Sequence, residues 1–149
     1  MTAPATTVAD AGDGAEQVEL RAPDDVLRTR HRVRDLAARH GFDLVSQTKL
    51  VTAVSELARN AVEYGGGGRA SFGLVESAGE RTRTGIAVRI EDDGPGIPDV
   101  EQAMTGGWSS GSGLGLGLPG SQRLVHEFAI DSAPGRGTRV RIVMWRRGR

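Results

Sequence analysis

The stretch Ser55-Glu56-Leu57-Ala58-Arg59-Asn60 lies within a segment whose apolar residues recur at helical spacing. Residues four apart on an α-helix share a face, so the Glu56 carboxylate and the Asn60 carboxamide should project side by side. Glu56 could then accept a proton while the side-chain oxygen of Asn60 holds a divalent cation. Because such a pair is more often a solvated helix face, its interpretation depends on the rest of the chain.

The helix that carries this pair is predicted to begin after Asp43, which can cap it, and to end at the glycine run Gly65 to Gly68. At about 100° per residue, Glu56 and Asn60 lie with Ala53 on the side away from the buried stripe. The stripe consists of Leu50, Val54, Leu57 and Ala61, with Val51, Ala58 and Val62 beside it. We therefore expect the pair to face water or a cavity. The glycine run is interpreted as a tight turn into the next strand.

A second motif, Asp92-Asp93-Gly94-Pro95-Gly96, directly follows a strand-like pattern of alternating apolar residues. A carboxylate that closes a strand can accept a hydrogen bond from an exocyclic amine. Glycines beside it let the backbone come close to a flat ring. Asp92, with Gly94 and Gly96, is placed to do this for adenine. The alternative explanation is a plain Pro-Gly turn after the strand.

A third motif, Gly111-Ser112-Gly113-Leu114-Gly115-Leu116-Gly117, alternates glycine and then opens a helix. Backbone N–H groups there, together with the positive end of the helix, form an anion site suited to phosphates. A flexible hinge is the alternative. The motif is not a Walker loop, because no Gly-Lys-Ser/Thr follows. It is not a dinucleotide fingerprint either, because no strand directly precedes it and the chain lacks βαβ alternation.

The whole pattern predicts one folded domain of residues 17–146, between a disordered tail (1–16) and a basic tail (147–149). Strands are expected at Val18 to Leu20, Arg69 to Glu76, Thr84 to Glu91, Phe128 to Ser132 and Thr138 to Trp145. Helices are expected from the Asp24 or Asp25 cap to Gly41, after Asp43, around Val100 to Met104, and from Leu116 to Phe128. The fold class is therefore α/β, a two-layer sandwich with three main helices on one face of a mixed, mostly antiparallel sheet. The glycine-hinged segment Ile97 to Ser110 suits a mobile lid.

Composition excludes several classes of protein. Nineteen basic and nineteen acidic residues cancel, so no overall charge favours nucleic acid or a membrane surface as partner. The absence of cysteine excludes a disulfide framework and a thiolate metal site. No segment approaches the ~18 apolar residues of a membrane span, and no signal peptide is recognisable at the N-terminus. A soluble cytoplasmic protein is expected.

Taken in this order, the three motifs resemble the GHKL, or Bergerat-fold, ATP-binding proteins, which include gyrase-type ATPases, sensor histidine kinases and anti-sigma-factor serine kinases. The resemblance runs from about Val18 to Trp145. It implies ATP and Mg²⁺ as cofactors, with Glu56 as general base, Asn60 as magnesium ligand and Asp92 as the acid that reads adenine. It further implies that Gly94 and Gly96 lie against the nucleotide and that Thr138 supports the adenine beside the aspartate. The residues that it places under the phosphates are Gly111, Gly113, Gly115 and Gly117.

Within this family, the sequences of Thr48 to Asn60 and of Gly115 to Gly120 are similar to those of the stand-alone serine/threonine kinases of bacterial stress signalling, and most similar to the stressosome switch kinase. That resemblance implies a kinase that phosphorylates a STAS-domain antagonist, is released, and then activates a phosphatase by binding it. Two alternatives stay open. One is an anti-sigma kinase that sequesters a sigma factor, and the other is an inactive module that only holds a partner. The intact Glu56 and Asn60 argue against the second alternative.

Overall fold

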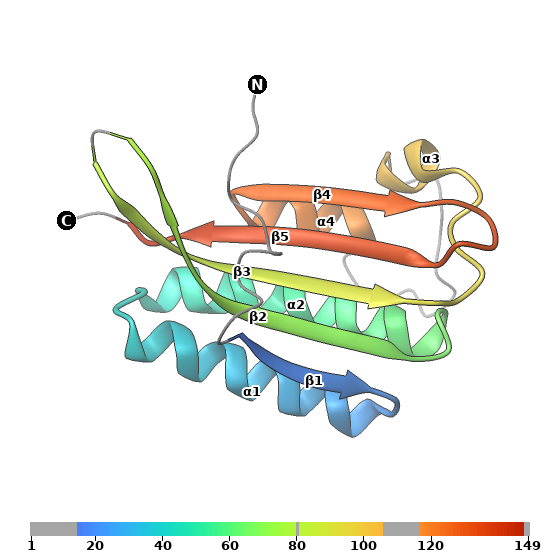
Figure 1. Cartoon of the computed structure of the whole chain (residues 1–149), viewed down its shortest axis with the longest axis horizontal. Coiled ribbons are helices and arrows are strands. Elements are labelled where there is room, and N and C mark those ends of the chain that lie inside the picture. Colours follow the sequence, from blue (N-terminus) through green and yellow to red (C-terminus); the bar gives the residue numbers. More distant parts are fainter. Residues whose placement is uncertain (1–14, 80, 106–116, 148–149) are drawn as a thin grey trace.

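The computed structural model describes residues 15–79, 81–105 and 117–147, which form a sheet covered on one face by helices (Figure 1). The sheet has the strand order β1-β2-β3-β5-β4, and each of its four neighbouring pairs is antiparallel. The strands are Glu16–Leu20 (β1), Gly68–Ser77 (β2), Arg83–Asp92 (β3), Glu127–Ser132 (β4) and Thr138–Trp145 (β5). The predicted two-layer α/β sandwich with a mostly antiparallel sheet is confirmed.

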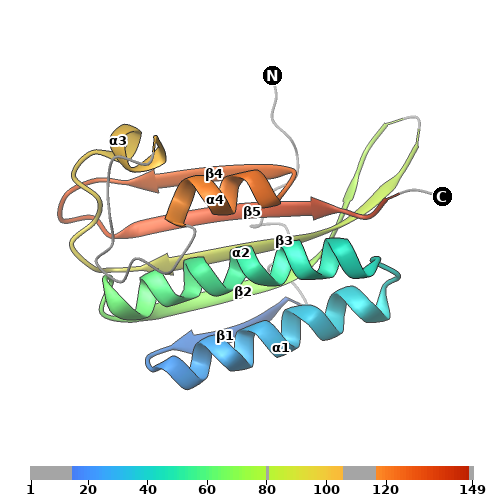
Figure 2. The same cartoon turned by 180° about the vertical axis from the view of Figure 1, so that it is seen from behind.

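Three longer helices form the second layer, seen in front of the sheet in Figure 2. They are Pro23–Arg39 (α1), Leu44–Glu63 (α2) and Gly117–Leu124 (α4), and the short helix Val100–Met104 (α3) follows β3. The predicted short helix at α3 is confirmed, and Asp99 caps it by accepting a hydrogen bond from the backbone N–H of Gln102 at 3.0 Å. Within the described ranges, none of the helices has the length and apolarity that crossing a bilayer requires.

Helix α2 is the centre of the helical layer and packs against α1, α4 and the sheet. Asp43 caps it as predicted, because Oδ1 accepts the backbone N–H of Ser46 at 2.7 Å. The prediction that the Ala53 and Glu56 side faces away from the core is wrong. Ala53 is fully buried and Glu56 is only 4% exposed. The reason is tertiary, because α2 packs against α1, α4 and the sheet, and the periodicity of α2 alone cannot show these contacts.

The start of α1 differs from the predicted cap. Ala22 is the N-cap residue, and Asp25 lies inside the first turn. From there its Oδ2 accepts the backbone N–H groups of Arg21 and Ala22 at 2.8 and 3.0 Å, so it satisfies donors at the helix start without being the cap. Leu27 of the same helix is an exposed apolar residue, with 49% of its surface exposed.

Two further boundaries differ from the prediction. Helix α4 ends at Leu124, not Phe128, because residues from Glu127 onward pair with β5 as β4. Strand β1 begins at Glu16 and so includes the last residue of the predicted tail. Residues 1–14 of that tail, and 148–149 at the other end, lie outside the described residues.

The core between the two layers fixes the positions of the strands and helices that meet near Asp92. Apolar residues of β2, β3 and β5 face α1, α2 and α4, and the largest fully buried ones include Phe72, Ile86 and Ile142. In the sheet, Asp92 at the end of β3 lies between Gly68 at the start of β2 and Thr138 at the start of β5. Helix α2 also ends here, so three elements converge around Asp92.

Candidate functional site

A cavity of about 210 Å³ lies where α2 and β3 end and β5 begins, and we name it the α2–β3 cavity. Four lining residues have polar side chains: Asn60 from α2, Tyr64 at the C-cap of α2, Asp92 from β3 and Thr138 from β5. Aliphatic side chains form most of the remaining lining: Leu57, Ala61, Ile90, Ile97, Leu118 and Val140. An apolar cavity with a few convergent polar groups is typical of a small-molecule site.

Asp92 is the buried acid of this cavity, with 8% of its surface exposed. Its Oδ1 accepts the backbone N–H of Gly94 at 2.9 Å. Burial raises the pKa of Asp92 above its ordinary value of 3.8, although hydrogen bonds from the backbone N–H groups of Gly94 and Thr138 oppose this rise. Each carboxylate oxygen can accept two hydrogen bonds, so the group keeps capacity to accept one from a ligand amine.

Backbone packing around Asp92 depends on missing side chains. A Cβ atom on Gly65 would lie 2.5 Å from Oδ2 of Asp92, and a Cβ atom on Gly94 would lie 2.6 Å from the Cα of Gly65. Gly96 lines the cavity, and a Cβ there would collide with the carbonyl oxygen of Ala133. The positions that side chains would occupy on Gly94 and Gly96 are thus filled by protein backbone. Sequence reasoning missed Gly65, although a run of four glycines was a signal.

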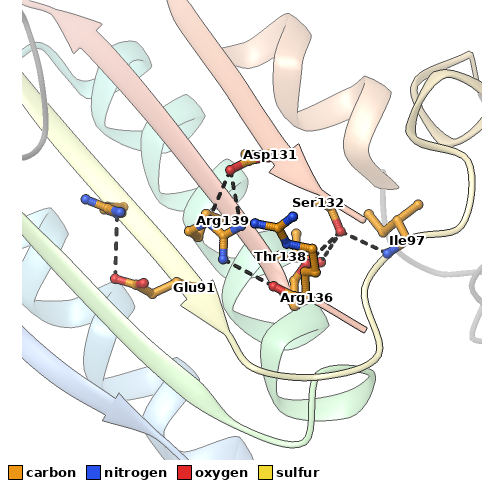
Figure 3. Close-up of polar contacts among 9 residues, drawn as sticks. Glu91, Ile97, Asp131, Ser132, Arg136, Thr138 and Arg139 are labelled. Atoms are coloured by element: carbon orange, nitrogen blue, oxygen red, sulfur yellow. Dashed lines mark hydrogen bonds and ion pairs between the residues drawn. The ribbon is translucent and has the colours of Figure 1, made fainter. Parts of the chain in front are cut away.

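Ser132, at the end of β4, joins the loop after Asp92 to Thr138 (Figure 3). Its Oγ accepts the backbone N–H of Ile97 at 2.9 Å, donates to the carbonyl of Gly137 at 2.8 Å, and lies 2.9 Å from the Oγ1 of Thr138. Because a serine hydroxyl has one hydrogen, Thr138 must be the donor in the last contact. Thr138 is one of the residues that line the cavity, and its hydroxyl oxygen then keeps its lone pairs for a ligand. Nothing in the sequence marks Ser132 as part of the site.

The side chains of Glu56 and Asn60 lie in two different environments. Asn60 lines the cavity, and among the described residues its carboxamide has no hydrogen-bond partner. Glu56, one turn earlier, is buried, and its Oε1 lies 3.3 Å from Nη2 of Arg59. It is not among the described residues that line the cavity. The structure therefore places Asn60 at the cavity and Glu56 beside it on the same helix.

Of the third motif, Gly111 to Gly117, the structure describes only Gly117. Gly117 begins α4 with a φ of 71°, in the left-handed region that favours glycine, and the next residue, Leu118, lines the cavity. Gly111, Gly113 and Gly115 lie outside the described residues, as does the predicted lid beyond residue 105. Among the described residues, no group of three or more histidines and carboxylates could hold a metal ion. A cation beside Asn60 would therefore need oxygen ligands from bound phosphates, which suits Mg²⁺.

Comparisons with known proteins show the family of this chain. A family described as histidine kinase-, DNA gyrase B-, and HSP90-like ATPase matches residues 45–148. The serine/threonine-protein kinase RsbT of Bacillus subtilis (strain 168) is 41% identical over 130 residues, which are 87% of this chain and 96% of RsbT. An anti-sigma F factor of Clostridium novyi (strain NT) is 36% identical over 96 residues, 62% of this chain and 66% of that protein.

Among solved structures, the RsbU and RsbW domains of Rv1364c from Mycobacterium tuberculosis match with a TM-score of 0.61. The match covers 91% of this chain and 34% of that one, at 22% sequence identity. At this identity the likeness supports the fold alone.

Proposed function

Because the chain belongs to the family of histidine kinase-, DNA gyrase B- and HSP90-like ATPases, we propose that it is an ATP-dependent serine/threonine protein kinase of bacterial stress or sigma-factor regulation. One observation carries the nucleotide part of this proposal: the buried Asp92 carboxylate lies in an apolar cavity that also contains Asn60 and Thr138. Asp92 would accept a hydrogen bond from the exocyclic amine of adenine, and the aliphatic lining would cover the faces of the ring. The Thr138 hydroxyl, oriented by Ser132, would support the adenine at the end that Asp92 contacts.

The residues of α2 supply the groups for phosphate transfer. Magnesium-ATP, when bound, supplies the γ-phosphoryl group that an acceptor hydroxyl takes while ADP leaves. Asn60, whose side-chain oxygen has no hydrogen-bond partner among the described residues, offers that oxygen to the cation. Glu56 would remove the proton from the acceptor hydroxyl, and Arg59, 3.3 Å away, holds the Glu56 carboxylate in place. The N-terminus of α4 at Gly117, with the glycines before it, would receive the phosphates.

We infer a folded protein as the acceptor, with a serine or threonine of a STAS-domain antagonist as the phosphorylated residue. The similarity to RsbT supports this choice, because RsbT is named as a serine/threonine-protein kinase and the match covers nearly its whole length. Negative charge added to the acceptor would be repelled by the acidic groups of the site, Glu56 included, and this would release the kinase. The released kinase would then bind a second partner, a phosphatase.

The similarity to anti-sigma F factors favours a second candidate, an anti-sigma kinase that sequesters a sigma factor. A binding module without catalysis is the third. All three share the fold, so only experiments on partners and phosphate transfer separate them.

The test combines labelled ATP, the purified chain and a STAS-domain protein encoded beside it. We expect an acid-stable phosphoprotein whose affinity for the kinase is lower than that of the unmodified protein. Tight binding of a sigma factor, with no phosphatase bound, would favour the anti-sigma kinase. Calorimetric binding of magnesium-ATP without phosphate transfer to any candidate would favour the inactive module, and the absence of ATP binding would contradict the proposal as a whole.

A further inference from the structure

The end of the sandwich opposite the α2–β3 cavity contains a larger hollow of about 810 Å³, which we name the arginine cavity. It lies where the α1–α2 connection, the β2–β3 hairpin and the end of β5 meet, on the side of the C-terminus in Figure 1. Four arginines line it, Arg81, Arg83, Arg146 and Arg147, with Thr82, Thr84, His126 and Trp145. None of the described residues that line it is acidic.

Among the described residues, few acidic partners compensate this positive charge. Nη1 of Arg146 donates to the carbonyl of His40 at 2.8 Å, and Cζ of Arg83 lies 4.9 Å from the ring centroid of Trp145. Both of these partners are neutral. In the part of the chain that the structure describes, the one ion pair of the four guanidinium groups joins Arg147 to Asp43 at 4.0 Å. At that length it is weak.

A second hollow of about 350 Å³ adjoins the arginine cavity, because His126 and Arg147 line both. It adds Lys49 and Arg123 and again has no acidic residue among its described lining. The two hollows thus bring six basic side chains together from separate segments of a chain whose formal net charge is zero. Such a concentration in a neutral protein indicates a local function for the charge.

The floor of the arginine cavity is fixed by hydrogen bonds. The backbone N–H of Trp145 donates to Nδ1 of His126, and its indole N–H donates to Oε2 of Glu127, both at 2.8 Å. Because Nδ1 is an acceptor, the neutral imidazole carries its proton on Nε2 and is a further donor. Burial lowers the pKa of His126, as do the charges of Arg83, Lys49 and Arg147, whereas Glu127 opposes the shift.

We propose that the arginine cavity and its adjoining hollow form a binding site for a phosphate group, separate from the α2–β3 cavity. Guanidinium groups bind phosphate oxygens through paired, charge-assisted hydrogen bonds, and the threonine hydroxyls and the imidazole add neutral donors. The source of the phosphate is either a free polyphosphate or a phosphorylated residue of a partner protein. This inference does not require the kinase activity proposed above, because none of its residues belongs to the α2–β3 cavity.

The test titrates the full chain, without nucleotide and at constant ionic strength, with three probes: inorganic phosphate, pyrophosphate and a capped phosphoserine pentapeptide. The His126 signal and the variants described below distinguish the arginine cavity from the α2–β3 cavity, and constant ionic strength removes general screening. Calorimetry gives the affinity. The imidazole proton signal of His126 locates the binding, because a bound anion should raise the pKa of that group.

The deciding variant combines Arg81→Gln and Arg147→Gln, and its matched control combines Arg32→Gln and Arg34→Gln on α1, which remove the same charge outside both hollows. We expect probe affinity to fall about tenfold or more in the first pair, as for a lost charge-assisted hydrogen bond, and to stay unchanged in the control. Stronger binding of pyrophosphate than of the peptide would identify a free polyphosphate as the source, and the reverse order a phosphoprotein. The proposal is overturned if no probe binds, if both pairs lose affinity equally, or if the His126 signal does not respond.

Discussion

The two ends of the sandwich are built by different means. At the α2–β3 cavity, backbone segments pack directly on one another through Gly65 and Gly94, around one buried carboxylate, Asp92. At the arginine cavity, long and exposed side chains such as Arg81 and Arg147 form the walls. The first site is a fixed shape with few charges, and the second is a concentration of charge with adaptable walls.

This difference determines how each end responds to mutation. A single methyl group added to a glycine of the α2–β3 cavity meets protein atoms at less than contact distance, so this cavity does not tolerate added side-chain atoms. Exposed arginines can be replaced with little effect on folding, because surface substitutions usually change stability by less than about 0.5 kcal/mol. A variant at one end should therefore change the properties of that end and leave the other end unchanged.

The largest effect is expected for Glu56→Gln. The substitution removes the proposed general base and keeps its shape, so phosphate transfer should fall by a factor of about 10² or more while ATP affinity is kept. Glu63→Gln, at the exposed end of the same helix, is the matched control. Steady-state transfer from labelled ATP and calorimetric ATP binding measure the two quantities. Transfer at the parent rate would mean that the base lies elsewhere, and altered binding of phosphate probes at the arginine cavity would show that the two ends are coupled.

Asp92→Asn should weaken ATP and ADP binding by about 1–3 kcal/mol, the scale for a hydrogen bond to a buried charged group. The preference for adenine over guanine nucleotides should fall as well. Asp93→Asn, at the exposed neighbouring residue, controls for the change of charge. ADP affinity equal to that of the parent would contradict the adenine-reading role of Asp92.

Gly65→Ala should damage the same cavity by steric overlap rather than by loss of a polar contact. The new methyl group would press on the Asp92 carboxylate, and overpacking of this kind costs about 1–3 kcal/mol. Both ATP affinity and the free energy of unfolding should fall. In Gly66→Ala the methyl group enters open space, so only the strain of its φ of 74° remains and ATP affinity should be kept. Equal losses of ATP affinity in the two variants would contradict the steric explanation.

The raised pKa of Asp92 predicts a smaller, pH-dependent effect on stability. Its carboxylate is disfavoured in the folded state, so the contribution of Asp92 to stability is fully present below its unfolded pKa, near 3.8. That contribution is lost as the pH rises through the folded pKa. Without nucleotide, Asp92→Asn should therefore be more stable than the parent at neutral pH, and the difference should shrink on acidification. Denaturant unfolding between about pH 4 and pH 8 measures it. A difference that grows on acidification would contradict the assigned direction.

Much of the α2–β3 end could be predicted from the sequence because its residues occur in short contiguous motifs. Asp92 ends a regular strand pattern, and Asn60 lies on a long periodic helix, so local rules of spacing were sufficient to find both. Thr138 was found only by family resemblance. The burial of Glu56 was mispredicted because burial depends on packing between elements that lie far apart in sequence, such as α2 and α4, and the end of α4 was itself predicted four residues too late.

The arginine cavity could not be predicted from the sequence. Its arginines come from the β2–β3 hairpin and from the residues that follow β5, and the adjoining hollow adds Lys49 from α2 and Arg123 from α4. Each group alone has the composition of a solvated surface. The antiparallel pairing of β3 with β5, which places Gly85 opposite Trp145, brings the two groups of arginines together. The sites that sequence reasoning misses are those whose residues share no local spacing.

The smallest effect is expected for Ser132→Ala, which tests whether the α2–β3 cavity depends on side chains as well as on backbone packing. Without the Ser132 hydroxyl, the Ile97 N–H loses its acceptor and the Thr138 hydroxyl is free to turn. The free energy of ATP binding should become less favourable by about 0.5–1.5 kcal/mol, the net contribution of one hydrogen bond. Ser132→Thr keeps a hydroxyl at the same Cβ and should restore most of the affinity, whereas Ser71→Ala, at the exposed contact with Gln17, should change nothing. A purely structural role for Ser132 would lower the free energy of unfolding without changing ATP affinity, so both are measured on each variant. If affinity is unchanged in Ser132→Ala, the orientation of Thr138 does not matter for the nucleotide, and backbone packing alone shapes this end of the molecule.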